Sequence, residues 1–222
     1  MKNNNVYYSI IASIVVAVGC GVSNGQNLIQ NGSFEDPVLN PFEDRRPVGS
    51  FNSWTVGHQF GGSAGVDIVS STYYWPAVSG TQSLDLVSDF ITTGNYLRQD
   101  ITTTIGQTYR LGFWYANNKD VPTATAHYVV KDSVNTLLDT AITHAGSTAA
   151  NMNWQFVQVD FTALATSTSI MFVHYSPSPA NSAIVLDDVS VVVVPEPATA
   201  ALGLAFLTVW GLNRRTGKAP QK

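Results

Sequence analysis

Apolar and polar residues alternate through most of the middle of the chain, a period of two that is typical of β-strands with one buried face. The clearest example covers residues 107–115, where one face collects Tyr109, Leu111, Phe113 and Tyr115. Residues 154–161 alternate in the same way. Residues 169–175 and 183–194 contain longer apolar runs, which indicate strands buried on both faces over part of their length.

Six shorter segments carry weaker strand patterns, and no segment shows a sustained helical stripe. These strands are expected at 28–34, 53–56, 66–69, 83–87, 96–103 and 125–131. Ten or so short strands at this spacing predict one all-β domain over residues 26–194. We expect an antiparallel β-sandwich, most simply a jelly roll.

Composition and charge narrow the function classes. Of the 222 residues, 45% are apolar and only 12% are charged, which supplies a core and argues against a disordered chain. Residues 26–194 hold six basic and fourteen acidic side chains, a net charge of −8. An acidic domain of this kind disfavours nucleic acid as a partner. Cys20 is the only cysteine, so the sequence predicts no disulfide framework.

The first 25 residues have the layout of a secretory signal peptide. Lys2 and three asparagines precede the apolar run 6–18, and small residues continue to Gly25. Cleavage after Ser23 or Gly25 fits the small-residue requirement. Residues 17–20 also resemble a weak lipobox ending at Cys20, so lipoprotein processing is an alternative. Either reading predicts an exported protein.

The last 28 residues, 195–222, resemble a PEP-CTERM sorting signal. Pro195, Glu196 and Pro197 precede an apolar run over 198–212, and Arg214 and Arg215 follow it. Fifteen helical residues span about 22 Å, short of the roughly 30 Å hydrocarbon core. The basic cluster is expected to stay in the cytoplasm. The resemblance implies a short transmembrane helix as a transient anchor and processing by an exosortase-type enzyme at the cell surface.

The exported part resembles galactose-binding-like jelly rolls, which include many carbohydrate-binding modules. Its opening, 27–36, and its closing segment, 184–191, resemble their first and last strands. The order of Ser53-Trp-Thr-Val, Gly65-Val-Asp-Ile-Val, Tyr74-Trp-Pro and Gly106-Gln-Thr-Tyr is similar to the choice-of-anchor C family. That family is related to the plant cell-wall family called domain of unknown function 642. The resemblance implies a surface or extracellular-matrix protein with affinity for polysaccharide.

Catalytic motifs are missing from the sequence of the exported domain. It has two glutamates, Glu35 and Glu43, in no recognisable catalytic setting, and it lacks the Gly-x-Ser-x-Gly elbow and the phosphate-binding loop. Its four histidines have no metal-ligand spacing. We therefore expect a non-catalytic protein. The alternative is an exported hydrolase that acts on polysaccharide through an unrecognised active site.

Three carboxylates are candidates for a structural calcium site. Glu35 ends the first expected strand, and Asp187 and Asp188 lie on the last strand. The jelly-roll resemblance makes those strands neighbours. Asp187 has the strand parity of Val185, Val189 and Val191, so it is expected to face the interior, where a bare carboxylate is costly. Calcium prefers such oxygen ligands. The alternative is an aspartate bonded to backbone groups in a bulge, with Glu35 solvated.

The segment Tyr73-Tyr74-Trp75-Pro76 is the candidate for sugar binding. Three adjacent aromatic residues in an extended segment cannot all face one core, so at least one is expected to meet solvent. Aromatic rings can then stack on the C–H faces of sugars. The alternative is that Trp75 is a core plug. Trp54, Trp114 and Trp154 lie within strand patterns and are expected in the core.

Overall fold

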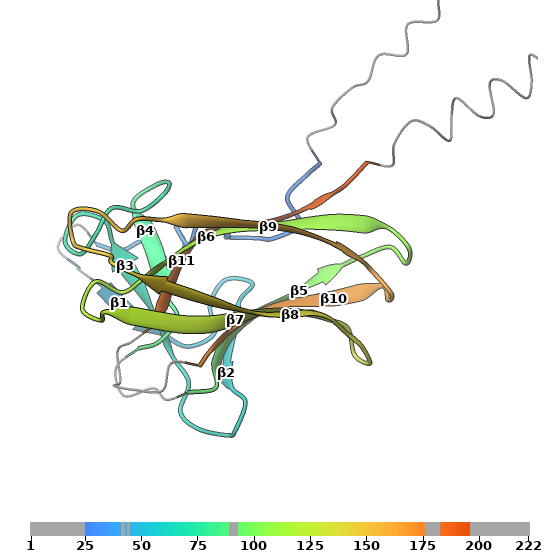
Figure 1. Cartoon of the computed structure of the whole chain (residues 1–222), viewed down its shortest axis with the longest axis horizontal. Helices are drawn as coiled ribbons and strands as arrows, with labels where there is room; N and C mark the ends of the chain where they lie inside the picture. The colour runs from blue at the N-terminus through green and yellow to red at the C-terminus, as the bar shows by residue number, and fades with distance from the viewer. Residues whose placement is uncertain (1–24, 41–42, 44, 89–92, 176–182, 196–222) are drawn as a thin grey trace, which may run out of the picture.

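The computed structural model describes residues 25–40, 43, 45–88, 93–175 and 183–195, with backbone alone for 45–48. They form two antiparallel sheets packed face to face (Figure 1). The six-stranded sheet has the order β1 (Arg45–Val48), β3 (Val66–Ser70), β4 (Gln82–Asp85), β11 (Ile184–Val193), β6 (Thr108–Asn117) and β9 (Gln155–Thr162). The five-stranded sheet has the order β2 (Thr55–His58), β5 (Asn95–Thr102), β10 (Ser167–His174), β7 (Thr123–Lys131) and β8 (Thr136–Ala145). The predicted all-β sandwich is confirmed.

The core lies between the two sheets, where alternate residues of facing strands meet. Phe113 of β6 packs edge-on against Phe172 of β10, with ring centroids 4.9 Å apart, and against Tyr128 of β7 at 5.4 Å. The predicted face of β6 is confirmed, since Tyr109, Leu111, Phe113 and Tyr115 are all buried. Side chains of opposite parity on each strand therefore lie on the two outer faces of the sandwich.

Three segments differ from the prediction. Residues 28–34 form no strand, although they run beside β11 with hydrogen bonds from Leu28 N to Val191 O and from Val189 N to Gly32 O. Positive φ angles at Asn31 and Phe34 break the extended conformation. The strands β1 and β8 were not predicted. His144 takes a buried, inward position of β8 and hides its alternation, because it is polar.

A β-bulge in β11 changes the side on which its residues lie. The register with β6 shifts between Asp187 and Ser190, and Asp188 has a φ of 48°. Val185 and Asp187 lie on the outer face of the six-stranded sheet, whereas Val189 and Val191 belong to the core. The expectation that Asp187 shares a face with Val189 and Val191 was wrong, because the extra residue reverses the parity.

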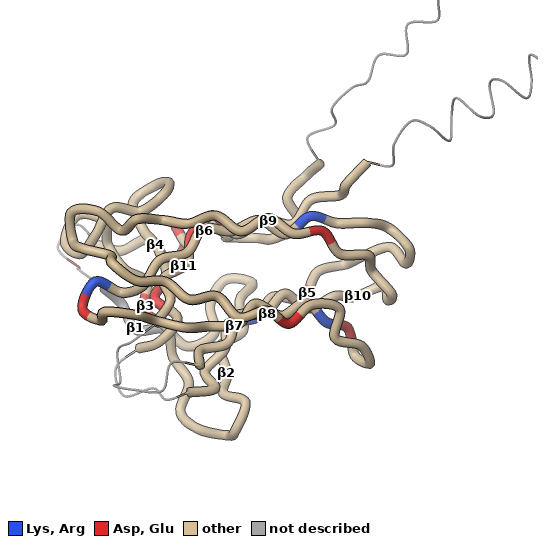
Figure 2. The backbone as a smooth tube through the Cα atoms, viewed as in Figure 1, with Lys and Arg blue, Asp and Glu red and all other residues tan. Residues whose placement is uncertain are grey.

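Among the described residues, charged residues are few, and their positions lie scattered over both layers (Figure 2). The described residues contain no helix with the length and apolar character needed to cross a membrane. The predicted signal peptide up to residue 24, Cys20 with it, and the sorting signal from Glu196 onward lie outside the described residues.

Candidate functional site

The loop between β3 and β4 folds over the outer face of the six-stranded sheet, and Trp75 anchors it. Trp75 is only 2% exposed and packs with Val69, Ala116 and Val185. Its Nε1–H donates a hydrogen bond to Ser83 Oγ, 3.0 Å away. Trp75 is therefore a buried core residue, which was the alternative to sugar binding. Burial of both its ring faces corrects the expectation that it stacks on sugar.

Its two neighbours are more accessible. Tyr73 is 51% exposed, and Tyr74 is half-buried. The Tyr74 ring meets Trp75 edge-on at 5.2 Å, and Lys119 Nζ lies 5.3 Å from the centroid of the Tyr74 ring. Tyr73 alone of the three aromatic residues presents a largely exposed side chain, so the predicted platform is reduced to a single ring.

The same loop is held by the three candidate calcium ligands. The buried Asp187 accepts hydrogen bonds at Oδ2 from the N–H groups of Val78 and Ser79, at 2.8 and 3.2 Å, and at Oδ1 from that of Asp188 at 2.8 Å. Burial raises the pKa of Asp187 to about 7, although these N–H donors favour the charged form. Asp188 Oδ1 accepts the hydroxyl of Ser79 at 2.6 Å.

Glu35 binds the far end of the loop. Its Oε1 accepts the N–H groups of Thr81 and Gln82, both at 2.9 Å, and its Oε2 accepts the Thr81 hydroxyl at 2.9 Å. The glutamate lies directly on Gly80, where a Cβ atom would come within 2.3 Å of Oε1. Gly80 also has a φ of 64°. A residue with a side chain would therefore clash with Glu35 and strain the backbone.

Each of the three carboxylates therefore accepts at least one hydrogen bond from the loop. Among the described residues, no three His, Cys, Asp or Glu side chains gather in an arrangement that could hold a metal ion. Calcium binding through Glu35, Asp187 and Asp188 stays a prediction. The bonds show what these residues do in the structure: they fasten the β3–β4 loop to both ends of the domain.

A second candidate site lies on the outer face of the five-stranded sheet, here called the five-strand face. Its base is an apolar cluster of Val129, Met171 and Val173, against which Tyr96 and Tyr175 pack. Tyr96 and Tyr175 are half-buried, so each keeps part of its ring exposed. The register places Tyr96 beside Val173, and Val173 beside His127. Aromatic and polar side chains from three neighbouring strands thus share one surface.

Tyr96 reaches across the edge of the sheet because its partner on β2 has no side chain. Gly57 pairs with Tyr96, and a Cβ atom at Gly57 would come within 2.4 Å of the Tyr96 Cζ and Oη atoms. The ring therefore occupies the space above the β2 backbone. A larger residue at position 57 would displace it.

Tyr175 and His127 are fixed by their partners. Their ring centroids are 4.6 Å apart, and the Tyr175 hydroxyl donates to Gln59 Oε1 at 3.0 Å. His127 Nδ1 lies 2.6 Å from Asp139 Oδ1 on β8, so the imidazole is oriented by a carboxylate. Such second partners hold the rings at this surface in defined positions.

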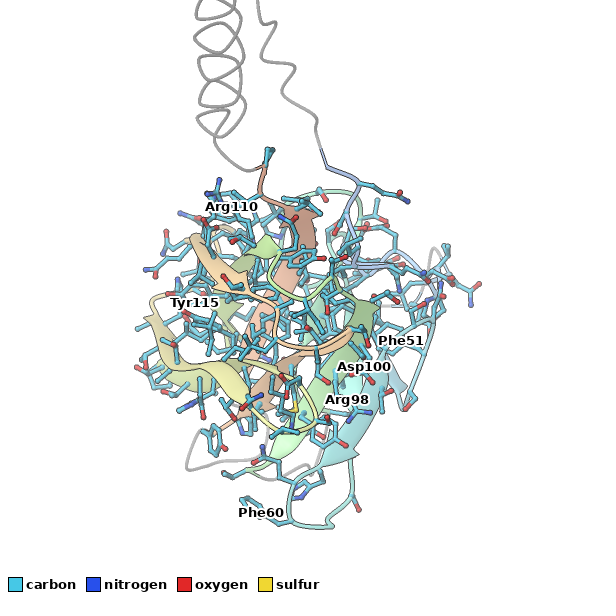
Figure 3. The ribbon with its side chains drawn as sticks, turned by 90° about the vertical axis from the view of Figure 1, so that its right-hand side faces the viewer. Phe51, Phe60, Arg98, Asp100, Arg110 and Tyr115 are labelled. Carbon is cyan, nitrogen blue, oxygen red and sulfur yellow. The ribbon has the colours of Figure 1, made fainter. Side chains whose placement is uncertain are left out.

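Charged groups continue the surface along β5, where Figure 3 labels Arg98 and Asp100. Arg98 Nε lies 3.5 Å from Asp100 Oδ1, close enough for an ion pair but without hydrogen-bond geometry. Asp100 Oδ1 accepts the Ser169 hydroxyl at 2.5 Å. The Arg98 side chain is 34% exposed, although its Nε atom is buried.

Sequence reasoning missed the five-strand face. The strand predicted at 96–103 already separates Tyr96, Arg98 and Asp100 from Leu97 and Gln99 by parity. The pairing of β5 with β10, and of β10 with β7, is what joins them to His127 and Tyr175. A period of two does not reveal these pairings.

Comparison with known proteins identifies the family of the chain. Residues 27–192 match the family described as "Protein of unknown function (DUF642)". The chain belongs to the DUF642 family. This confirms the part of the sequence resemblance that concerned domain of unknown function 642, whereas choice-of-anchor C and PEP-CTERM stay predictions.

Relatives of this DUF642 domain include a much longer protein. The chain is 26% identical to Halomucin of Haloquadratum walsbyi over 200 residues, which cover 86% of this chain and 2% of Halomucin. The chain therefore spans a small fraction of that relative. The match concerns one region of Halomucin and leaves its other regions without a counterpart here.

Among solved structures, the DUF642 domain resembles TmCBM61 in complex with β-1,4-galactotriose, with a TM-score of 0.51 and 18% identity over 77% of this chain and 100% of that one. It also resembles the CBM22-1 xylan-binding domain of Xyn10C from Paenibacillus barcinonensis, with a TM-score of 0.52 and 16% identity over 78% and 97% of the two chains. At these identities the likeness shows a shared jelly-roll fold.

Proposed function

We propose that the domain is a non-catalytic module that binds a neutral polysaccharide at the five-strand face. The observation that carries this proposal is the pair of half-exposed rings, Tyr96 and Tyr175, over the apolar layer of Val129, Met171 and Val173. A pyranose ring has an apolar C–H face that packs on an aromatic ring and a rim of hydroxyl groups. The rings supply the first contact, since tyrosine combines an apolar body with a polar tip.

Hydrogen-bonding groups beside the rings suit the hydroxyl rim. Arg98 offers donors, Asp100 and Asp139 offer acceptors, and His127 lies between them on the sheet. A few polar groups around an apolar surface are the usual composition of a small-molecule site. The jelly-roll fold shared with TmCBM61, whose structure is in complex with β-1,4-galactotriose, and with the xylan-binding CBM22-1 domain supports the same ligand class.

The charge of the domain favours a neutral glycan. Residues 26–194 carry a net charge of −8, which repels a polyanion before any specific contact forms. Uronic-acid polymers are therefore disfavoured.

Titration of the protein with β-1,4-galactan and xylan, and with polygalacturonate as the acidic comparison, tests the proposal. We expect binding of a neutral polymer, and at least a tenfold loss of affinity in Tyr96→Ala. Tyr175→Phe is the matched control, because it removes the hydroxyl bonded to Gln59 and keeps the ring; its loss should be several-fold smaller. A thermal melt of each variant separates lost contact from lost folding.

The same samples decide between binding and hydrolysis. Incubation with each polymer should release no reducing ends above the blank. Steady release by the wild type would favour the exported hydrolase instead. Unchanged affinity in Tyr96→Ala would remove the five-strand face from consideration.

We also propose that the protein is exported, processed through its C-terminal PEP-CTERM signal by an exosortase-type enzyme, and released to or held at the cell surface or extracellular matrix. The sequence order of Pro195-Glu196-Pro197, an apolar run, and Arg214 with Arg215 supports this proposal. A polysaccharide-binding module has its ligand in that compartment, so the two proposals are consistent.

A further inference from the structure

The six-stranded sheet also carries an open groove on its outer face, with a volume of about 490 Å³. One wall is the N-terminal segment around Gly32 and Ser33, and the other is formed by β6, β9 and the bulge of β11. This volume is within the range of small-molecule sites. The groove faces away from the five-stranded sheet, since the two layers pack through their inner faces (Figure 1).

Two aromatic side chains form an exposed surface in this groove. Trp114 of β6 and Phe156 of β9 are register partners, and their ring centroids are 5.0 Å apart with an interplanar angle of 42°. Phe156 is 49% exposed and Trp114 is half-buried. The expectation that Trp114 lies in the core was wrong, because its parity places it on the outer face. A single exposed apolar side chain is common on protein surfaces, but two neighbouring aromatic rings exposed in a groove are typical of a binding site.

Gly112 leaves room for this surface. A Cβ atom there would lie 3.2 Å from both Phe156 Cζ and Ser190 Oγ, tighter than ordinary contact. The Phe156 ring therefore leans over the backbone of β6 at a position without a side chain. Gly112 leaves space for the Phe156 ring, as Gly57 leaves space for the Tyr96 ring on the other sheet.

The polar wall of the groove comes from the bulge. Asp188, with its left-handed φ of 48°, and Ser190 line the groove together with Ser33. One Asp188 oxygen, Oδ1, accepts the Ser79 hydroxyl, and a carboxylate has acceptor capacity for further bonds. The opposite wall is braced, because Asn31 Oδ1 accepts the N–H of Asp36 at 3.1 Å. Hydroxyl and carboxylate groups thus border the exposed rings.

We propose that this groove is a second glycan-binding site, in which Trp114 and Phe156 stack on a neutral sugar and Asp188 accepts its hydroxyl groups. The two rings lie side by side on one sheet and form a surface, whereas quaternary ammonium ligands are typically held in an aromatic cage. The carboxylate disfavours an acidic sugar. This site does not depend on binding at the five-strand face. With sites on both outer faces, one molecule bridges two polysaccharide chains.

Calorimetric titration with β-1,4-galactotriose and with xylotriose measures the number of sites. We expect two sites in the wild type and one in Phe156→Ala, which removes a largely exposed ring. Asp188→Asn keeps a residue that tolerates a positive φ, and we expect it to weaken the second site about tenfold. Leu164→Ala, which removes another exposed apolar side chain, is the matched control and should retain both sites. Turbidity of a xylan solution, a measure of cross-linking, should fall in Phe156→Ala and in Asp188→Asn and stay at the wild-type level in Leu164→Ala.

The outcomes for the two sites are separable. One site in the wild type, lost in Tyr96→Ala and unchanged in Phe156→Ala, would overturn the groove and leave the five-strand face standing. One site lost only in Phe156→Ala would overturn the five-strand face and support the groove. Binding of choline at the groove without binding of either sugar would overturn the glycan assignment, and no sugar binding at all would overturn both.

Discussion

At the scale of single residues, two buried titratable side chains have opposite effects on stability. His174 lies between the sheets with no hydrogen bond at Nδ1, and burial lowers its pKa to about 4. Asp187 lies on the outer side under the β3–β4 loop, and burial raises its pKa to about 7. In the fold, both groups therefore favour the neutral form through much of the acidic range.

The two effects should nearly cancel between pH 4 and 6.5. There the unfolded chain protonates His174 while the folded protein does not, so the stability from His174 is lost as the pH falls from about 6.5 to 4. The folded protein keeps the Asp187 proton while the unfolded chain loses it, so the stability from Asp187 is lost as the pH rises from about 4 to 7. Each slope is about 1.4 kcal/mol per pH unit.

Substitution of either residue should reveal the slope of the other. Urea unfolding between pH 4 and 7 should show Asp187→Asn losing stability as the pH falls, and His174→Phe gaining it, while the wild type stays nearly flat. Groups whose pKa is lowered, such as Asp132 and Asp160, act below this window. Parallel profiles for both variants and the wild type would show that the two residues titrate normally.

Residue-scale reasoning from sequence succeeded where parity alone decides exposure. It identified the buried face of β6 and left the core-plug reading of Trp75 open. It misplaced Trp114 because a period of two does not tell which face of a strand will be covered. In this fold the β3–β4 loop packs on part of the outer face through Trp75, and Trp114 lies beside a groove.

At the scale of elements, buried and half-buried carboxylates hold the β3–β4 loop in place. Asp187 and Glu35 both bind its backbone close to the start of β4, Asp187 through Val78 and Ser79, and Glu35 through Thr81 and Gln82. Asp187 and Asp188 lie on the last strand, as predicted. The segment expected to form the first strand is irregular instead. Its irregular backbone arises from side-chain bonds, such as those of Asn27 and Asn31, that the alternation does not encode.

The calcium hypothesis is tested on this loop. If calcium binds through Glu35, Asp187 and Asp188, thermal melts should shift upward with added calcium and downward with chelator. Ion at a hundred times its dissociation constant adds about 2.7 kcal/mol. Glu35→Gln should abolish the shift, whereas Asp160→Asn, on the far side of β6, should retain it. Equal midpoints with calcium and with chelator would assign the carboxylates to hydrogen bonding alone.

At the scale of the whole molecule, the sandwich was predictable and the functional surfaces were not. Period-two segments and turn residues define the class of fold, and the resemblance of the family motifs indicates a jelly roll, but neither gives the strand order. Which side chains meet on an outer face depends on strand order. The neighbours of β10, for example, are β5 and β7, which lie far from it in sequence. The five-strand face and the Trp114–Phe156 groove both arise from such non-local pairings.

The two ends of the chain carry the last prediction. If residues 1–25 and the segment after Pro195 are signals, intact-mass measurement of protein recovered from the cell surface should show both removed. Arg214→Ala with Arg215→Ala removes the charges that hold the tail in the cytoplasm, so we expect the tail to be retained and the protein to stay in the membrane fraction. Arg214→Lys with Arg215→Lys, which keeps the charge, should be processed. Lys218→Ala with Lys222→Ala is the matched control, since it removes two charges but leaves the arginine pair beside the apolar run. Complete processing of the double arginine-to-alanine variant would contradict the sorting signal without bearing on either glycan site.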